Sequence, residues 1–377
     1  MKILLINVVS KSGSTGAICS SLFDYYKSKG HDVYFAYGRG KKTKDKFLYK
    51  FCFELESKFW HFLSFFTGNL YGGMPFSTLR LKKFIKRIDP DVINIHCING
   101  FCVNIYSLLA FLKKNGRKVY ITHHAEFLYT GTCGYSLDCN GFKKQCESCP
   151  LNFKNVHKNF LKMCKTFDNS SFKHICVSPW VEERLKESAM LKSPYAVTIL
   201  NPIKTFPITK NPYFEYQGKI IILYVASQLN NPEKGANQIY QIAKNVSDYE
   251  FFVIGDHEKE NKDNIHFVGR VSKEEISNFY ANANCSIILS KKETFSMVVG
   301  ESLMYGTPVI GFKAGGPETI SVSEFSTFVN QCDLKGFCDE LKKLVSKDIS
   351  RQEIISQSRQ KYSLEIIGEQ YLTEYAK

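Results

Sequence analysis

The sequence lacks any apolar run of the length that crosses a bilayer. No stretch approaches the roughly 20 consecutive apolar residues that a membrane-spanning helix requires. The amino-terminal stretch MKILLINVVSKSGSTGAI places Lys2 before a short apolar segment, but Asn7 interrupts that segment and the small-residue cleavage site of a secretory signal is missing. We therefore interpret this stretch as a first buried strand and expect a cytoplasmic protein.

Tandem repeats and low-complexity tails are also absent. The 13 cysteines are odd in number and scattered over the chain, which argues against a complete disulfide framework. With 44% hydrophobic and 23% charged residues, the composition is that of a folded globular protein. A chain of 377 residues is too long for one ordinary core, so two domains of similar size are expected.

Basic residues exceed acidic ones, and the formal net charge is +14. Such a charge indicates an anionic partner, which could be a nucleotide, a nucleic acid or an acidic membrane surface. A generally lysine-rich surface explains the charge equally well, because net charge alone does not fix a function.

Apolar, strand-like runs alternate with helical stretches along almost the whole chain. The runs lie at residues 3–9, 32–38, 92–97, 118–124, 174–179, 220–227, 251–256, 265–271 and 285–290. This alternation favours parallel sheets with crossover helices, the α/β class. A stretch containing three prolines, residues 199–219, separates the two series and is typical of a linker.

We therefore predict two Rossmann-like, doubly wound domains that face a cleft. The first spans residues 1–200, and the second spans residues 201–377, with its C-terminal helix packing back on the first. A ligand is expected in the cleft, at the carboxyl ends of the strands.

Residues 41–88 depart from this rhythm, because lysines are mixed with aromatic residues such as Phe59, Trp60 and Phe62. An amphipathic helix packed on the first domain is the commoner explanation. The alternative is peripheral contact with an anionic membrane or a lipid-linked substrate. That contact would place the protein at the inner face of the cytoplasmic membrane.

The stretch KKETFSMVVGESLMYGTPVIGFKAGGPETI, residues 291–320, indicates an anion-binding site. A helix over 296–305 follows a buried strand, and Glu293 lies in the loop between them. The amides expected at the amino terminus of this helix are those of Phe295, Ser296 and Met297. Unpaired amides there favour a phosphate, and Glu301 in the next turn suits a ribose diol. Gly300 costs about 1 kcal/mol relative to alanine, so we expect close approach of the backbone to a ligand.

Two weaker signals lie at the ends of other strands. Lys234, in a Lys-Gly pair after the strand at 220–227, can hold a diphosphate leaving group by its charge. Gly13 and Gly16 lie between the first strand and helix, where the backbone can approach a phosphate. The loop with Gly13 and Gly16 lacks the full dinucleotide fingerprint and is weak evidence by itself. Together with Lys234 and the stretch 291–320, it supports an anion-binding site at the carboxyl ends of the strands.

The motifs ETFSMVVGE, SLMYGTPVIGFKAGGPE and EKG resemble those of the family-4 retaining glycosyltransferases of the GT-B fold. GSTGAI, VINIHCINGF, THHAEF and the cysteine cluster are similar to the subset that builds bacterial surface polysaccharides such as colanic acid. The resemblance covers nearly the whole chain. It implies transfer from a nucleotide-sugar donor to a saccharide or lipid-linked acceptor, with no metal required for catalysis.

Carried over by resemblance, Glu293 contacts hydroxyl groups of the donor sugar, Glu301 the ribose and Lys234 the diphosphate. Gly16 lines the donor site from the other domain, and His124 matches a family histidine near the reacting sugar. The chain departs from the family where an arginine is usual, because positions 227–229 are Ser-Gln-Leu. Ala125 also replaces the usual aspartate after the histidine, which leaves Glu126 as the candidate to orient His124. Satisfied histidines at a strand end are the alternative for His123 and His124.

The segment 133–149 carries four cysteines, Cys133, Cys139, Cys146 and Cys149. Four thiolates within such a loop can complete a structural, tetrahedral zinc site that leaves no open position for catalysis. Two disulfides are the rival interpretation, which a reducing cytoplasm disfavours.

Three alternatives to glycosyl transfer stay open. One is a sugar-nucleotide epimerase of the same fold, which would need no acceptor. Another is a non-catalytic sugar-binding protein. The third is a zinc-containing nucleic-acid-binding protein, but no recognisable module with base-stacking aromatics accompanies the basic residues, so we expect no nucleic-acid partner.

Overall fold

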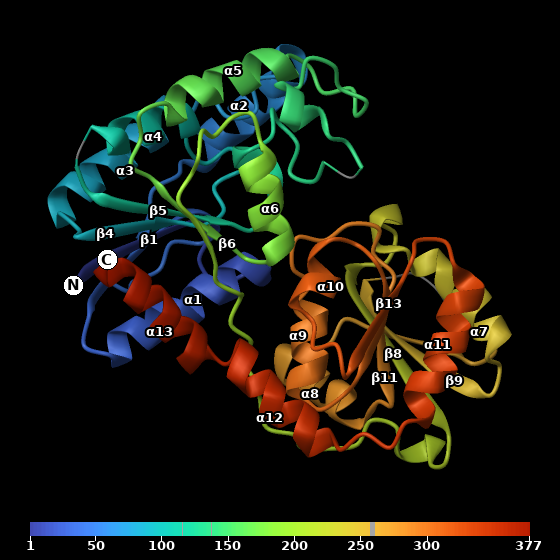
Figure 1. Ribbon diagram of the computed structural model, residues 1–377. Coiled ribbons are helices and arrows are strands. Elements are labelled where there is room, and N and C mark those ends of the chain that lie inside the picture. Colours follow the sequence, from blue (N-terminus) through green and yellow to red (C-terminus); the bar gives the residue numbers. More distant parts are fainter. Residues whose placement is uncertain (115, 137, 257–260) are drawn as a thin grey trace. The chain divides into compact units, whose positions relative to one another are not determined.

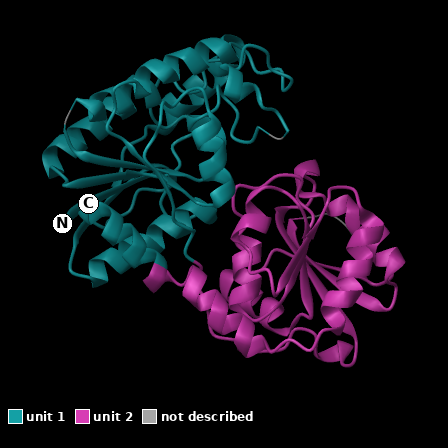
Figure 2. Cartoon of the chain, in the orientation of Figure 1, with its two compact units in different colours: residues 1–202, 367–377 teal, residues 203–366 magenta. Residues whose placement is uncertain are grey.

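A computed structural model describes residues 1–114, 116–136, 138–256 and 261–377. The chain forms two compact units, which Figure 2 shows in different colours. Unit 1 holds Met1–Pro202 and Ile367–Lys377, and unit 2 holds Ile203–Ile366. The domain boundary expected near residue 200 lies close to this division, and the end of the chain lies with unit 1.

Unit 1 is built on seven parallel strands in the order β3-β2-β1-β4-β5-β6-β7. Its strands are β1 (Lys2–Val9), β2 (Asp32–Arg39), β3 (Leu48–Lys50), β4 (Val92–Ile95), β5 (Lys118–His123), β6 (Lys173–Cys176) and β7 (Ala196–Thr198). Its helices are α1 (Gly13–Ser28), α2 (Glu54–Thr67), α3 (Pro75–Ile88), α4 (Ile105–Lys113), α5 (Val156–Phe167) and α6 (Pro179–Glu187), with short 3-10 turns at Glu126–Leu128 and Gly141–Lys144.

Helices cover both faces of this sheet, with α1 and α13 (Leu364–Ala376) on one face and α3, α4 and α5 on the other (Figure 1). Tyr26 of α1 and Tyr375 of α13 pack edge to face at 5.9 Å between ring centroids. Gly368 lets the two helices meet, since a Cβ there would lie 2.3 Å from the ring of Tyr25. Asn94 of β4 donates to the Tyr375 hydroxyl at 2.6 Å, so α13 is bonded to the sheet as well.

Unit 2 contains six parallel strands in the order β10-β9-β8-β11-β12-β13. Its strands are β8 (Ile220–Gln228), β9 (Tyr249–Asp256), β10 (Ile265–Gly269), β11 (Cys285–Ile288), β12 (Val309–Phe312) and β13 (Ser326–Val329). Its helices are α7 (Ile239–Asn245), α8 (Lys273–Asn282), α9 (Met297–Met304), α10 (Gly316–Ile320), α11 (Leu334–Ser346) and α12 (Arg351–Tyr362), with 3-10 turns at Phe214–Tyr216, Pro232–Lys234 and Ala236–Gln238.

The apolar runs of the sequence correspond to strands that are buried on both faces. In β8, Ile222 and Tyr224 belong to a core cluster that includes residues of α7 and α11. Ile221 and Leu223 belong to a second cluster, with Phe279 of α8. Because successive side chains of a strand point to opposite faces, a strand between two helix layers is apolar at nearly every position. The predicted α/β fold with two Rossmann-like domains is confirmed.

Residues 41–88 differ from the single amphipathic helix that we considered. They hold the edge strand β3 and two helices, of which α3 buries Leu81, Phe84 and Ile85 against unit 1. Helix α2 is different, because its buried residues are Ser57 and Ser64. Of the helices that the structure describes, none combines the length and the apolar composition needed to cross a bilayer.

Candidate donor-binding site

Both sheets have a point at which the strand order reverses, between β1 and β4 in unit 1 and between β8 and β11 in unit 2. In open α/β sheets, ligands bind outside the carboxyl ends of the strands at such a switch point. The loops that follow β8 and β11 carry Lys234 and Glu293. The switch point of unit 2 therefore holds two of the three charged residues for which the sequence predicts donor contacts.

The loop after β8 is held by hydrogen bonds of its own residues. Asn231 accepts from the amide of Glu233 at 3.0 Å, and the Tyr224 hydroxyl donates to the carbonyl of Lys234 at 2.6 Å. Gly235 follows with φ of 72°, and a Cβ there would lie 2.1 Å from the carbonyl oxygen of Leu289. Only glycine allows this conformation and this contact with the residue that follows β11.

Lys234 and Glu293 meet directly. Lys234 Nζ donates to Glu293 Oε1 at 2.5 Å, and Ser290 Oγ donates to the same oxygen at 3.0 Å. The amide of Lys291 donates to the carbonyl of Glu233 at 2.9 Å, which joins the two loops. The side chains of Lys234 and Glu293 are 30% and 15% exposed, so the pair is shielded but accessible to a ligand.

The second glycine turn supports the loop that carries Glu293. The amide of Glu293 donates to the carbonyl of Ala314 at 3.0 Å, and the amide of Gly316 donates to the carbonyl of Glu293 at 2.8 Å. The Glu318 carboxylate accepts from the amides of Ala314 and Gly315 at 3.0 and 2.8 Å. A Cβ on Gly316 would lie 2.3 Å from the carbonyl of Thr294, so glycine is needed for the two segments to touch. The turn thus positions Glu293.

The amino terminus of α9 has an unusual backbone. Ser296 precedes the helix with φ of 71° and ψ of 97°, a conformation that costs a residue with a side chain about 1–3 kcal/mol. Phe295 and Ser296 are buried, and Met297 begins the helix, within one residue of the predicted start. The Ser296 side chain makes no capping hydrogen bond to α9, so it does not compete with an anion for the first amides of the helix.

Glu301 lies in the second turn of α9. The Tyr280 hydroxyl of α8 donates to Glu301 Oε2 at 3.0 Å. Burial raises the pKa of Glu301 above its ordinary value, while the Tyr280 hydrogen bond and the charge of Lys273 act in the opposite direction. The explanation expected for Gly300 is wrong: a Cβ there would lie 2.9 Å from the side chain of Ile203, so internal packing and not ligand approach requires the glycine.

Gly13 and Gly16 lie at the start of α1 in unit 1. Gly13 is the first residue of α1, has φ of 65° and has open space around its Cβ position. A Cβ on Gly16 would lie 3.1 Å from Val9 Cγ2 and 3.2 Å from the carbonyl carbon of Lys11. Gly16 therefore lets the loop after β1 fold tightly over α1, a role within unit 1.

His124 follows β5 and pairs with a histidine that the sequence analysis did not single out. His124 Nε2 and His96 Nδ1 lie 2.9 Å apart, so one ring donates and the other accepts. His123 pairs in the same way with His174, at 2.8 Å. Burial lowers the pKa of His124 and of His174 to about 4, so both rings are neutral at pH 7.

Glu126 does not orient His124. Its carboxylate accepts from the amide and hydroxyl of Ser136, at 2.6 and 2.9 Å, and from Arg184 Nε at 2.7 Å. The Glu126 side chain is fully buried, and Arg184 is 11% exposed. A buried carboxylate needs such a partner, so this pair fixes the segment after β5 to α6.

The cysteine segment carries the four thiols for which a structural zinc site is expected. Cys133, Cys139, Cys146 and Cys149 are free thiols, so the structure does not contain the two alternative disulfides either. Burial raises the pKa of Cys146 to about 11. Across the described ranges, no three His, Cys, Asp or Glu side chains are grouped so that they could hold a metal ion. Zinc binding stays a prediction from the ligand spacing.

Two family models match adjacent parts of this sequence. Residues 18–205 match the model described as Glycosyltransferase Family 4, and residues 206–361 match the model described as Glycosyl transferases group 1. The chain belongs to glycosyltransferase family 4. The division between the two matches, after residue 205, lies close to the division between the two units.

Relatives of this family-4 glycosyltransferase include two proteins described as uncharacterised. A 41.2 kDa protein in the cps region of Klebsiella pneumoniae is 27% identical over 67% of this chain and 67% of the relative. A glycosyltransferase of Methanocaldococcus jannaschii is 25% identical over 53% of this chain, and the match spans 56% of the archaeal protein. This chain thus spans only about half the length of the archaeal relative.

Solved structures resemble the fold of this family-4 glycosyltransferase over its full length. Sucrose-phosphate synthase from Thermosynechococcus elongatus superimposes with a TM-score of 0.70 at 14% identity, covering 100% of this chain and 98% of that one. Anabaena HepE in complex with UDP gives 0.66 at 12% identity and full coverage of both chains. A putative UDP-N-acetylglucosamine 2-epimerase from Listeria monocytogenes gives 0.54 at 13%, over 98% of this chain and 94% of that one. At these identities the likeness shows the GT-B fold alone.

The residues that the sequence analysis missed act as supports. Ser290 and Glu318 hold Glu293 and the turn behind it, and Tyr280 holds Glu301. Ser290 could have been found, since it lies three residues before Glu293 at the same strand end. Tyr280 lies on another helix, and no spacing rule in the sequence connects it with Glu301.

Proposed function

We propose that this chain is a retaining glycosyltransferase that moves a sugar from a nucleotide-sugar donor to a saccharide or lipid-linked saccharide acceptor, in bacterial surface polysaccharide biosynthesis. The observation that carries the proposal is the 2.5 Å pair of Lys234 and Glu293 at the switch point of unit 2, together with the amino terminus of α9 that follows it. The cps-region relative supports the pathway, and the solved complexes of HepE with UDP and UDP-glucose support the donor class.

In this proposal, the bond between the anomeric carbon and the diphosphate oxygen breaks while negative charge builds on the diphosphate. Lys234 Nζ and the amides of Ser296 and Met297 stabilise that charge, more strongly in the transition state than in the ground state. Glu293 accepts hydrogen bonds from hydroxyl groups of the donor sugar, and Glu301 accepts hydrogen bonds from the ribose diol. The acceptor hydroxyl attacks from the face that the leaving group occupied and passes its proton to the departing diphosphate oxygen, and we assign no covalent nucleophile.

His124 lies near the reacting sugar in this proposal. Because burial lowers its pKa to about 4, the ring is neutral at pH 7 and would act through a hydrogen bond and not through charge. The proposal contains no metal step, so transfer should not require an added divalent cation.

A thermal-shift screen against UDP, GDP, ADP and their sugars tests the proposal. A ligand that binds only the folded state raises the melting temperature. One nucleotide and its sugar should raise it for the wild type, while Lys234→Ala and Glu301→Ala should abolish the shift. If both variants respond like the wild type, the site is wrongly assigned.

The second candidate function is a sugar-nucleotide epimerase, which the fold likeness to the Listeria protein supports. Incubation with the donor alone separates the two functions. An epimerase would convert the donor into an isomeric sugar nucleotide, whereas a transferase would require an acceptor before the sugar moves.

A further inference from the structure

Helix α2 turns four phenylalanine side chains away from unit 1, whereas the ring of Trp60 packs against Gly73. Its buried residues are Ser57 and Ser64, at 0% and 6% exposure. The large apolar side chains that α2 exposes, each by 59% or more, are Leu55, Phe59, Phe62, Phe65 and Phe66. A surface helix normally buries such residues, and a concentrated apolar patch in solvent marks an interaction site.

Polar contacts hold α2 in this orientation. Glu54 accepts from Arg39 Nε at 2.7 Å, and Glu56 accepts from the amide of Ser77 at 2.9 Å. At the other end, Asn155 donates to the carbonyl of Thr67 at 2.9 Å. The orientation is thus fixed at both ends by hydrogen bonds, and the apolar side chains between them are left for a partner.

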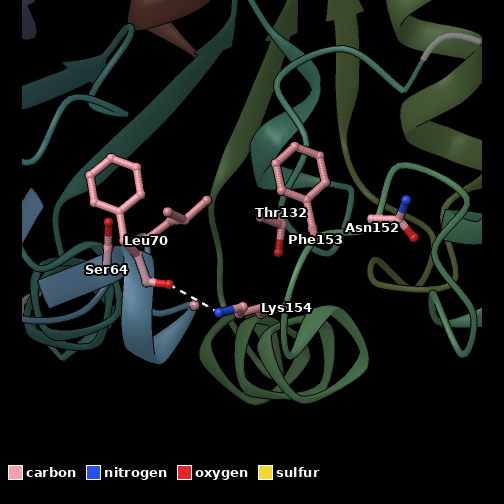
Figure 3. Close-up of a pocket in the computed structure, with 8 residues that line it drawn as sticks. Ser64, Leu70, Thr132, Asn152, Phe153 and Lys154 are labelled. Atoms are coloured by element: carbon pink, nitrogen blue, oxygen red, sulfur yellow. Dashed lines mark hydrogen bonds between the residues drawn. The ribbon is translucent and has the colours of Figure 1, made fainter. Parts of the chain in front are cut away.

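A pocket at the end of α2 continues its apolar surface inward. The pocket has a volume of about 200 Å³ and lies between α2 and the segment that precedes α5. Leu70 and Phe153 line it from opposite sides, with Lys154 nearby (Figure 3). Lys154 Nζ donates to the carbonyl of Phe65 at 3.2 Å, which places a cation beside the exposed rings.

Lysines surround this apolar surface. The outward face of α5 exposes Lys158, Lys162 and Lys165. A hollow of about 470 Å³ between α4 and α5 is lined by Lys113, Lys114, Lys162 and Lys165. None of the described residues that line this hollow is acidic. Helices α2, α4 and α5 gather on the same side of the seven-stranded sheet (Figure 1).

We propose that α2, α5 and the α4–α5 hollow form one docking surface for an anionic lipid bilayer. The phenylalanines of α2 enter the boundary between headgroups and acyl chains, and the lysines contact anionic headgroups. The proposal extends the proposed function, because a lipid-linked acceptor is presented at a bilayer. Vesicle binding needs neither donor nor acceptor, so its outcome is independent of glycosyl transfer.

The charges favour a bilayer over a second copy of the chain. In a twofold dimer the same patch occurs on both partners, so the lysines of α5 would face one another. Opposite charge, which an anionic bilayer supplies, attracts each of these lysines. The net charge of +14 adds to this attraction at a distance.

The test is co-sedimentation with vesicles of phosphatidylcholine alone and with added phosphatidylglycerol. The wild type should bind the anionic vesicles, and increasing salt should weaken the binding. Phe62→Ser with Phe66→Ser should weaken it at least about tenfold, because two exposed rings lose their apolar burial. The matched control is Ile208→Ser with Phe214→Ser in unit 2, where the side chains are 56% and 69% exposed. It should bind like the wild type.

Charge reversal tests the lysines separately. Lys162→Glu with Lys165→Glu should weaken binding more than about 25-fold, since each lost cation counts for roughly fivefold. Lys342→Glu with Lys347→Glu, which makes the same charge change on exposed residues of unit 2, should have a smaller effect. The thermal shift with the nucleotide that stabilises the wild type should survive in every variant.

Three outcomes overturn the proposal. The first is that the wild type binds neither kind of vesicle. The second is that the phenylalanine variant binds vesicles as well as its control does. The third is that the wild type binds neutral and anionic vesicles equally. Sedimentation velocity tests the alternative that a second copy of the chain covers this surface. A dimer that the phenylalanine variants abolish, without vesicle binding, would assign the surface to a second copy.

Discussion

Replacing Lys234 with methionine removes the ammonium group and keeps most of the side-chain length. Lys234 Nζ lies 2.5 Å from Glu293 Oε1, and the lysine side chain is 30% exposed. A hydrogen bond from such a cation to a charged acceptor contributes about 1.5–3 kcal/mol. Lys234→Met should therefore weaken binding of the nucleoside diphosphate selected by the thermal-shift screen roughly 10- to 150-fold, measured by isothermal titration calorimetry.

Replacing Glu293 with glutamine should act in the opposite direction on the same ligand. The glutamate charge competes with the diphosphate for Lys234 Nζ, so Glu293→Gln should bind the same nucleoside diphosphate within about threefold of the wild type, or more tightly. The same variant should lose affinity for the corresponding nucleotide sugar, because the proposed contact with the sugar hydroxyls is weakened. Opposite effects of two variants of one ion pair are difficult to attribute to general unfolding.

Lys291→Met is the matched control. Lys291 lies in the loop of Glu293, pairs with Glu233 at 3.7 Å and is 52% exposed, so its charge is screened by solvent. Its replacement should change the affinity for the same nucleoside diphosphate less than about threefold. Equal affinity in Lys234→Met and Lys291→Met would refute the assignment of Lys234 to the diphosphate.

Four further predictions concern the supports of the site and the stability of the units. Glu301→Gln should lose the thermal shift with the donor yet keep or raise the melting temperature, because burial raises the pKa of Glu301 and its charged form opposes folding at neutral pH. Gly316→Ala should lower the free energy of unfolding by about 1–3 kcal/mol in urea titrations, because a Cβ would contact the Thr294 carbonyl. The pKa of His124 and of His174 is lowered to about 4, so the free energy of unfolding should be at its full value above pH 6.5 and should fall as the pH drops. At pH 5 each ring should lower the free energy of unfolding by about 2 kcal/mol. Replacing either histidine with glutamine should remove its share of this pH dependence. If segment 133–149 holds structural zinc, mass spectrometry should find stoichiometric zinc in the purified protein, and metal-free folded protein would contradict it.

The sequence predicted the fold well because the signal is local and repeated. A strand such as β8, buried on both faces, must be apolar at nearly every position, and polar loops separate it from the next helix. The approach of Lys234 to Glu293 could also be expected, although 59 positions separate them. Each follows a parallel strand, and the carboxyl ends of neighbouring parallel strands meet at one edge of the sheet.

Contacts between elements that are distant in the sequence were harder to predict. Glu126 was considered as a partner of His124, but it bonds to Arg184 of α6 and the partner of His124 is His96. Both pairings depend on which strands are neighbours, and short polar motifs do not encode that order. The reason for Gly300 was misjudged in the same way, because Ile203 approaches it from the start of unit 2.

The orientation of α2 shows a different limit. The mixture of lysines and aromatic residues led to the expectation of an amphipathic helix whose apolar face packs on the first domain, but the phenylalanines of α2 are exposed. Two small polar residues, Ser57 and Ser64, instead face unit 1. Their spacing of seven residues places them on one side of a helix and is the sequence signal that could have indicated this orientation.

The most direct measurement is a crystal structure with the nucleoside diphosphate that gives the largest thermal shift. The account predicts a diphosphate oxygen within about 3 Å of Lys234 Nζ, and another oxygen at hydrogen-bond distance from the amide of Ser296 or Met297. A diphosphate bound away from both Lys234 and the amino terminus of α9 would contradict it.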